Sequence, residues 1–328
     1  MINKVKVLTW FLNRRCNLNC QYCKITKDYQ NSPYPTIDYF NNNQIKYINI
    51  RDTLDLMKNH NPNCFNIFMG GEPLLNEDLI DIIKYCNQNS ILYTIISNGS
   101  CNNLLDRFFS NIDEVMGFTV SIDPIIFDSQ YDSDRYFKSL NGLNCLLKYK
   151  NKIKDPVAEV TCDSRNYKYL LKTLDLLTSN GINSVISFID VYKNKYYDFS
   201  GIEKDSDLLV YKTPELKKIL EDAKNYNIHM PQSLNILYDC LPYNFKCKIQ
   251  SLDNIVIDSD GAVRLCLRIR GEKTPSKKIY KYLNGSLVDL KNNLQEDQNK
   301  LCEGCNWTSC IMTSEYDLDG MIHSDKRK

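Results

Sequence analysis

The first 190 residues alternate short apolar runs with segments of helical periodicity, and this alternation restricts the fold more than any other feature of the chain. Strands that alternate with helices are typical of parallel βα units. Six strand-like runs are expected near residues 5–12, 65–69, 91–96, 117–122, 157–162 and 184–190. They predict six βα units, either in an open sheet or in an incomplete barrel, because periodicity does not distinguish the two.

Helical spacing between these runs supports the prediction. Leu79, Ile82, Ile83 and Cys86 recur on one helical face, after a predicted N-terminal cap at Asn76. The same spacing recurs in three further segments, near residues 47–57, 136–147 and 167–174.

The pattern changes after residue 190. A stretch rich in Tyr, Lys and Asn leads to Thr213 and Pro214, which predict the start of another helix. Shorter strands, turns and cysteines follow. We therefore expect two domains, a barrel over residues 1–200 and a small cysteine-rich auxiliary domain over residues 201–328.

Composition excludes several classes of protein. The 328 residues are 43% hydrophobic and 25% charged, as in soluble globular proteins. Lys and Arg number 41 against 40 for Asp and Glu, which gives no general attraction to nucleic acid or to anionic membranes. The apolar stretch at residues 7–12 is too short for a membrane span or a signal peptide. We expect a cytoplasmic protein without nucleic-acid or membrane partners.

The chain contains 14 cysteines, more than an ordinary enzyme of a reducing compartment needs. Five lie singly in apolar segments and are expected to be core residues: Cys64, Cys86, Cys101, Cys145 and Cys162. The other nine form three clusters: Cys16, Cys20 and Cys23; Cys240, Cys247 and Cys266; Cys302, Cys305 and Cys310. Clustered cysteines indicate metal binding.

The first cluster, Cys16, Cys20 and Cys23, has the spacing C-x3-C-x2-C directly after the first predicted strand. Thiolates are the usual ligands of iron–sulfur clusters, and a short loop can wrap three of them around one four-iron cube. Three ligands leave one iron open. The alternatives are three unrelated thiols or a zinc site, but structural zinc normally takes four protein ligands, and no fourth Cys or His lies nearby.

A second motif ends the second predicted strand, where residues 65–69 run into Gly70, Gly71, Glu72 and Pro73. Two glycines let a ligand approach the backbone closely, and Glu72 supplies an acceptor. By itself the motif also fits a plain turn. Its combination with the cysteine motif is far more specific.

In this order and strand context, the two motifs resemble those of the radical S-adenosylmethionine (SAM) superfamily. The resemblance spans roughly residues 5–190 and implies an α/β fold, a partial (β/α)6 TIM-like barrel with both motifs at the carboxyl ends of strands. It implies that Cys16, Cys20 and Cys23 hold a [4Fe-4S] cluster whose open iron chelates SAM. An external donor would supply one electron, SAM would be cleaved to methionine and a 5′-deoxyadenosyl radical, and the radical would remove a hydrogen atom from the substrate.

The resemblance also implies a set of SAM-binding residues. Tyr22 matches the position next to the adenine, and residues 70–73 match the segment that meets the methionine amine. Five more candidates end the third and fourth strands, the last two near the ribose: Ser97, Asn98, Gly99, Ser121 and Asp123. Each of these five also fits a turn or a cap. No catalytic side chain is assigned, since the cofactor carries the chemistry.

The later cysteines resemble the SPASM and Twitch extensions of radical SAM enzymes. Cys247 is followed by Gly261, and after four more residues by Cys266, in a predicted hairpin. Cys302 and Cys305 then form a C-x2-C pair. SPASM proteins carry at least seven cysteines for two auxiliary clusters, whereas this chain has six after the barrel. The resemblance therefore implies one auxiliary [4Fe-4S] cluster, held by these four cysteines.

Two alternatives stay open for this second centre. Cys240 or Cys310 could replace one of the four ligands, or could belong to a partial second cluster. A zinc ribbon also fits paired cysteines at these spacings. A cluster with four protein ligands has no open iron, so its expected role is electron transfer.

The leading hypothesis is a maturase that modifies a peptide or protein side chain, because SPASM and Twitch extensions most often accompany such enzymes. Against it, the first strand begins by Val5, which leaves no room for the N-terminal peptide-recognition domain that many of them carry. The alternative is a dehydrogenase or epimerase of a sugar-like or aminocyclitol-like molecule, which a single auxiliary cluster favours. A non-catalytic metal-binding scaffold would require the motif at residues 70–73 to be accidental.

Overall fold

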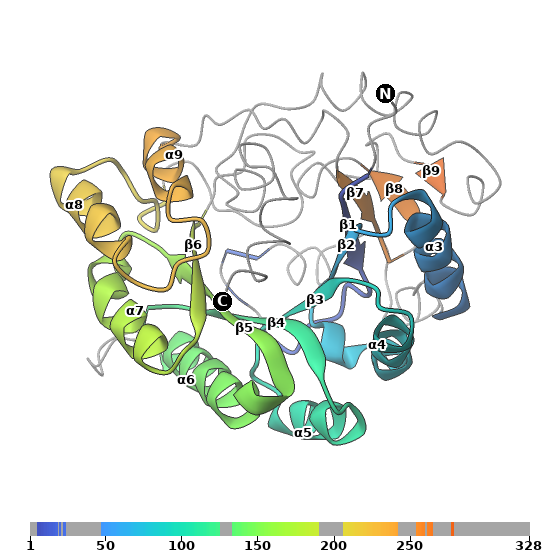
Figure 1. Ribbon diagram of the computed structural model, residues 1–328. Helices are drawn as coiled ribbons and strands as arrows, with labels where there is room; N and C mark the ends of the chain where they lie inside the picture. The colour runs from blue at the N-terminus through green and yellow to red at the C-terminus, as the bar shows by residue number, and fades with distance from the viewer. Residues whose placement is uncertain are drawn as a thin grey trace.

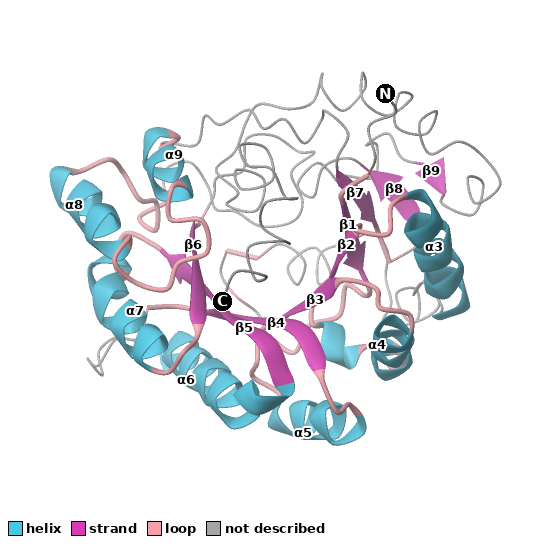
Figure 2. Ribbon diagram, in the orientation of Figure 1, coloured by secondary structure: helices cyan, strands magenta, loops and turns pink. Residues whose placement is uncertain are grey.

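A curved, mainly parallel sheet with helices along its convex side forms the body of the molecule (Figure 1). Figure 2 shows the strands as an inner layer and the helices as an outer one. This computed structural model describes residues 5–18, 20, 22–23, 47–124, 133–189, 206–241, 254–259, 261–264 and 277–278. Of the two folds that periodicity left open, the curvature corresponds to the incomplete barrel.

All six predicted strands are present and pair in parallel: β1 Val7–Phe11, β2 Phe65–Met69, β3 Tyr93–Ser97, β4 Val115–Ile122, β5 Ile153–Cys162 and β6 Asn183–Phe188. They lie in the order β6-β5-β4-β3-β2-β1, so each strand neighbours the next one along the chain. β5 begins four residues earlier than predicted, because Ile153 and Asp155 already pair with β4 before Pro156.

The described helices are α3 Tyr47–His60, α4 Leu79–Gln88, α5 Asn102–Asn111, α6 Ser133–Tyr149, α7 Leu170–Ser179, α8 Pro214–Ala223 and α9 Ser233–Asp239. The predicted start of α8 is confirmed, since the Thr213 hydroxyl accepts a hydrogen bond from the Leu216 amide at 3.0 Å. None of the described helices is long and apolar enough to span a membrane.

The predicted cap of α4 at Asn76 is wrong by two residues, since Asp78 occupies the N-cap position. A short 3-10 turn at Pro73–Leu75 follows β2 and delays the helix. The Asn76 side chain instead donates to the Leu12 carbonyl at 3.1 Å and accepts from the Asp78 amide at 2.9 Å. Asn76 therefore fastens the end of β1 to the segment after β2.

The core fills the space between the sheet and its helices. Neighbouring strands contribute aromatic side chains to it: the ring centroids of Trp10 and Phe68 lie 6.3 Å apart, and those of Phe68 and Tyr93 lie 6.1 Å apart. Four of the five cysteines expected in the core are buried, and Cys101 is half-buried.

The predicted hairpin after residue 250 is confirmed but lies in an unexpected place. It consists of β7 Asn254–Ile257 and β8 Ala262–Arg264, with a positive φ of 77° at Gly261 in the turn. β7 pairs in parallel with β1, and β8 pairs with β9 Lys277–Lys278. A hairpin from the expected auxiliary domain thus extends the sheet of the barrel.

Gly142 in α6 tests how tightly this helix packs on the sheet. A methyl group there would lie 2.7 Å from Val120 Cγ1 and 3.0 Å from Ile122 Cγ2. We expect Gly142→Ala to lower the free energy of unfolding by about 1–2 kcal/mol, because overpacking outweighs the gain of about 1 kcal/mol in helix propensity. Urea denaturation measures the change.

The matched control is Asn144→Ala, at an exposed position of the same helix, with an expected change within about 0.5 kcal/mol. A Gly142→Ala protein as stable as the wild type would show that α6 does not pack this closely.

Candidate functional site

The candidate site lies at the carboxyl edge of the sheet, where parallel strands bring together loops that are distant in sequence. The segment after β1, residues 13–23, is called the cysteine loop here. Residues 70–73 follow β2, residues 98–99 follow β3, and Asp123 follows β4. The structure thus places the predicted cluster motif beside the predicted SAM-binding segments.

The three thiols of the cysteine loop are half-buried and belong to one electrostatic environment. The pKa of the Cys16 thiol is raised to about 12, chiefly by burial and to a lesser extent by the negative charges of Glu72, Cys23 and Cys20, against the lowering effect of the Leu18 amide. Without metal, Cys16 is therefore protonated at neutral pH, and metal binding would displace its proton.

Two N–H groups point at the Cys16 sulfur. The Leu18 amide donates to Sγ at 3.4 Å, and Asn98 Nδ2 donates at 3.7 Å. The loop is tightened by a turn in which the Cys23 amide donates to the Cys20 carbonyl at 3.0 Å. Hydrogen bonds to sulfur are characteristic of iron–sulfur sites, where they stabilise charge on the thiolate.

The donor set fits a cluster better than a single ion. Among the residues that the structure describes, no three His, Cys, Asp or Glu side chains converge tightly enough to hold one metal ion. The thiolates that ligate a four-iron cube bind different irons and do not converge on one point. Three thiolates on one loop are the donor set that such a cluster takes, and they are one ligand short of the four that structural zinc normally takes.

Gly70 and Gly71 are required by the backbone of the cysteine loop. The Gly71 amide donates to the Asn13 carbonyl at 2.9 Å, and the Glu72 amide donates to the Arg15 carbonyl at 2.7 Å. A Cβ at Gly71 would lie 2.1 Å from the Arg15 carbonyl oxygen, and one at Gly70 would lie 2.3 Å from that of Asn13. Their missing side chains, interpreted above as space for a cofactor, serve first to seat the loop.

Glu72 is completely buried and links the ends of β2 and β3. Its Oε1 accepts from the Leu74 amide at 3.0 Å and the Ser97 hydroxyl at 2.9 Å, and its Oε2 accepts from the Asn98 amide at 2.9 Å. Burial raises the pKa of Glu72, while these three donors oppose the rise. Both oxygens are therefore engaged by the protein itself.

The residues after β3 form a turn that contacts the cysteine loop. The Gly99 amide donates to the Ser97 hydroxyl at 3.1 Å, and Gly99 has a positive φ of 65°. Asn98 Nδ2 donates to Asn17 Oδ1 at 2.9 Å as well as to Cys16. These hydrogen bonds fix the segment after β3 beside the candidate cluster, and they are compatible with both a turn and a SAM-binding role.

The residues around β4 are joined to two groups that sequence reasoning missed. Ser121 Oγ lies 3.5 Å from Glu159 Oε2 on β5, and Lys138 Nζ donates to the Tyr22 hydroxyl at 3.2 Å. The Asp123 amide donates to a hydroxyl on α6 at 2.8 Å. Glu159 had a visible signal, a charge within an apolar strand, whereas Lys138 resembles any charged residue of an amphipathic helix.

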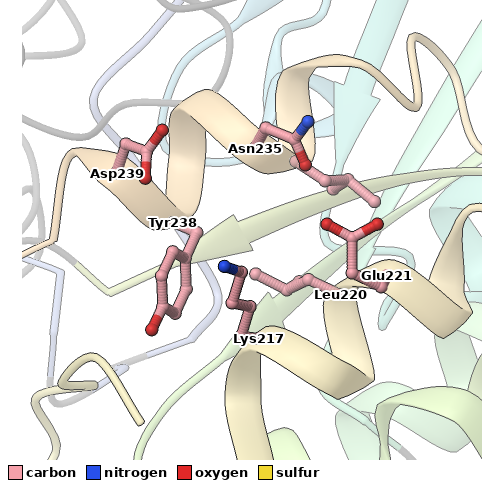
Figure 3. Close-up of a pocket in the computed structure, with 7 residues that line it drawn as sticks. Lys217, Leu220, Glu221, Asn235, Tyr238 and Asp239 are labelled. Carbon is pink, nitrogen blue, oxygen red and sulfur yellow. The ribbon is translucent and has the colours of Figure 1, made fainter. Parts of the chain in front are cut away.

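The second predicted centre is largely outside the described residues. Cys247, Cys266, Cys302, Cys305 and Cys310 all lie there. Cys240 is described and is buried at the C-terminal cap of α9. No predicted site residue lines the pocket of about 230 Å³ between α8 and α9 (Figure 3), whose lining is Lys217, Leu220, Glu221, Leu234, Asn235, Tyr238 and Asp239.

Gly71→Ala tests the close approach of the two motifs. Because the added methyl group would overlap the Arg15 carbonyl, we expect the free energy of unfolding of the metal-free protein to fall by at least about 2 kcal/mol. We also expect faster iodoacetamide alkylation of the cysteine loop, measured by mass spectrometry. The control is Gly181→Asn, since Gly181 has a φ of 71° and no atom within 4 Å of an added Cβ. Unchanged stability and alkylation in Gly71→Ala would contradict the packing described.

Two known proteins match this chain in sequence over most of its length. An uncharacterized protein of Methanocaldococcus jannaschii is 26% identical over 280 residues, which is 83% of this chain and 88% of that protein. The radical SAM cyclopropyl synthase TigE of Paramaledivibacter caminithermalis is 24% identical over 271 residues, which is 78% of this chain. The chain spans only 46% of TigE.

Two solved structures share the fold. SuiB of Streptococcus suis, bound to its precursor peptide SuiA, aligns with a TM-score of 0.63 at 13% identity, over 98% of this chain and 74% of SuiB. The protein anSMEcpe, with bound AdoMet and Kp18Cys peptide, aligns with a TM-score of 0.56 at 14% identity, over 89% of this chain and 82% of anSMEcpe. The sequence profile of the radical SAM superfamily matches residues 10–198, more than half of the chain. The chain therefore belongs to the radical SAM superfamily, whose enzymes use a [4Fe-4S] cluster and S-adenosylmethionine.

Proposed function

We propose that this radical SAM enzyme holds its [4Fe-4S] cluster on Cys16, Cys20 and Cys23 and abstracts a hydrogen atom from a peptide or protein side chain. The observation that carries the cluster assignment is the juxtaposition of three half-buried thiols with the segment at residues 70–73. When bound, the cluster and SAM supply reductive cleavage to a 5′-deoxyadenosyl radical.

The protein positions and shields this chemistry. The β2 end holds the start of the cysteine loop through backbone hydrogen bonds, and the Leu18 amide and Asn98 stabilise charge on the Cys16 sulfur. Since the thiols are half-buried, the loop also limits the access of water to them. None of these tasks needs a general base.

SAM is assigned to the carboxyl edge of the sheet. The residues are those expected from the sequence: Tyr22, Gly70, Gly71, Glu72, Pro73, Ser97, Asn98, Gly99, Ser121 and Asp123. Because both oxygens of Glu72 already accept protein hydrogen bonds, we assign the contribution of residues 70–73 to their backbone and give the Glu72 side chain a supporting role.

A peptide substrate is supported by the proteins that share the fold. SuiB was solved with a precursor peptide, and anSMEcpe with a peptide and AdoMet. The alternative, a dehydrogenase or epimerase of a sugar-like or aminocyclitol-like molecule, is favoured by the count of cysteines after the barrel. Formation of 5′-deoxyadenosine coupled to product, with short peptides or with aminocyclitols as probes, distinguishes the two.

We further propose an auxiliary [4Fe-4S] cluster on Cys247, Cys266, Cys302 and Cys305, in a SPASM/Twitch-type domain over residues 201–328. The hairpin expected between the first two of these cysteines is present, with Gly261 in its turn. Its first strand pairs with β1, which leads directly into the cysteine loop. This proximity suits a centre that exchanges electrons with the barrel.

Replacing Cys16, Cys20 and Cys23 together with Ala tests the first cluster. The anaerobically reconstituted wild type is expected to hold about eight iron atoms per chain, and the triple variant about four, because one cube is lost. SAM cleavage, measured as 5′-deoxyadenosine, should disappear. Cys101→Ala is the control and should keep both the iron and the cleavage. Undiminished cleavage in the triple variant would refute the assignment.

Replacing Cys302 and Cys305 with Ala tests the auxiliary cluster. About four iron atoms should be lost, and product formation should stop while abortive 5′-deoxyadenosine formation continues, because the substrate radical has lost its electron acceptor. Stoichiometric zinc in the native protein would favour a zinc ribbon instead, since zinc is redox-inert. Wild-type product formation by the double variant would remove only the electron-transfer role.

A further inference from the structure

A buried lysine, Lys138 of α6, faces the cysteine loop at the position of Tyr22. We propose that Lys138 raises the reduction potential of the cluster by holding a fixed positive charge against this loop. The proposal rests on the assignment of the cluster to Cys16, Cys20 and Cys23. Lys138 would act through its charge and through Tyr22, so it is a positioning residue.

The burial of Lys138 is unusual for its residue type. Only 6% of its surface is exposed, although lysine is almost never buried without a partner. Its Nζ donates to the Tyr22 hydroxyl at 3.2 Å and lies 5.9 Å from the centre of the Tyr22 ring. Tyr22 stands between the last two cysteines, so this contact joins α6 to the centre of the cluster motif.

The fold places Lys138 with precision. The next residue, Ser139, accepts a hydrogen bond from the Asp123 amide at 2.8 Å, which fixes α6 to the end of β4. One turn later, Gly142 lets α6 approach so closely that a methyl group there would lie 2.7 Å from Val120 Cγ1. A helix held this near the sheet can direct a lysine side chain into the mouth of the barrel.

The groups around Lys138 keep it charged. Burial by itself lowers the pKa of Lys138, but the facing groups Tyr22, Asp123 and Cys20 outweigh burial and raise it above the usual value. Glu159 on β5 also interacts with the ammonium group. Burial therefore does not remove the ordinary positive charge that this lysine carries at neutral pH.

A fixed positive charge near the cluster changes the free energy of one step, the reduction of the cluster. In this step one electron passes from a reduced external donor to the oxidised cluster. The donor, which is oxidised, is a flavoprotein or an iron–sulfur protein, and dithionite takes its place in the test. No bond forms or breaks in this transfer. The added electron makes an anionic cluster more negative. A nearby positive charge in a poorly solvated site stabilises that state, because net charge and solvent exposure govern cluster potentials.

The charged groups on the two sides of the cysteine loop differ. The carboxylate of Glu72 faces Cys16, but three protein donors hold it. On the side of Tyr22 the neighbour is Lys138, which donates to the Tyr22 hydroxyl. Among the described residues, the cysteine loop therefore has Glu72, held by three donors, on the side of Cys16, and on the side of Tyr22 it has Lys138, whose positive charge offsets Asp123 and Glu159.

The experiment compares Lys138→Met, Lys138→Arg and a matched control, Lys148→Met. Lys148 lies on the same helix but is exposed and pairs with Asp106 at 2.6 Å. Each protein is reconstituted anaerobically, and the cluster is titrated with dithionite and mediators while its reduced state is followed by electron paramagnetic resonance. The signal that vanishes in the triple cysteine variant is the one assigned to this cluster.

We expect Lys138→Met to shift the reduction equilibrium at least tenfold towards the oxidised cluster, which is 59 mV for a one-electron couple. Lys138→Arg and Lys148→Met should keep the wild-type midpoint. A wild-type midpoint in Lys138→Met with full iron content would overturn the proposal. If no component of the wild-type signal is lost in the triple cysteine variant, the cluster assignment itself is refuted.

If Lys138→Met loses iron, Lys138→Gln provides the second test, because its amide can still bond to Tyr22 without a charge. A lowered midpoint in that variant supports the proposal, and an unchanged one overturns it. Loss of iron from both neutral variants, with retention in Lys138→Arg, would also overturn it. Lys138 would then hold the loop and would not tune the cluster.

Discussion

The structure of the candidate site depends on the close approach of two backbone segments, residues 13–15 and residues 70–72. The Gly71 and Glu72 amides donate to the carbonyls of Asn13 and Arg15, so the pairing of β1 with β2 continues beyond the strands into the cysteine loop. The Asn13 side chain returns a hydrogen bond to the Glu72 carbonyl at 3.0 Å. The start of the short loop that carries three thiols is thereby fixed to the sheet by backbone hydrogen bonds.

The buried carboxylate of Glu72 connects these two segments to the end of the third strand. Glu72 binds the Ser97 hydroxyl and the Asn98 amide, and Asn98 in turn donates to Cys16. A buried carboxylate is stable only when donors surround it, so this network fixes the turn after β3 as firmly as it fixes Glu72. Sequence reasoning assigned Glu72 to the cofactor, whereas the contacts show a residue that organises other residues.

The C-terminal hairpin enters the same arrangement through a charge pair. Arg14 precedes Cys16 by two residues, and its guanidinium binds both carboxylate oxygens of Asp258, at 2.7 Å and 3.4 Å. Asp258 is 1% exposed and follows β7, the strand that pairs with β1. The loop that carries the first three cysteines is therefore held from both neighbouring strands, β2 and β7.

The amino-acid sequence by itself determined the six parallel strands, the helices α3, α4, α6 and α7, the cysteine and glycine motifs, and the start of α8, because each depends on periodicity or spacing within a few residues. Tertiary structure decided the rest. The pairing of β7 with β1, the Arg14–Asp258 pair across 244 residues, and the contact of Lys138 with Tyr22 join distant segments and leave no local pattern. Asn76 and Gly71 show the same limit. The local sequence predicted a helix cap at Asn76, but its side chain donates to the end of β1. It predicted a ligand contact at Gly71, but the atoms nearest to an added Cβ belong to the cysteine loop.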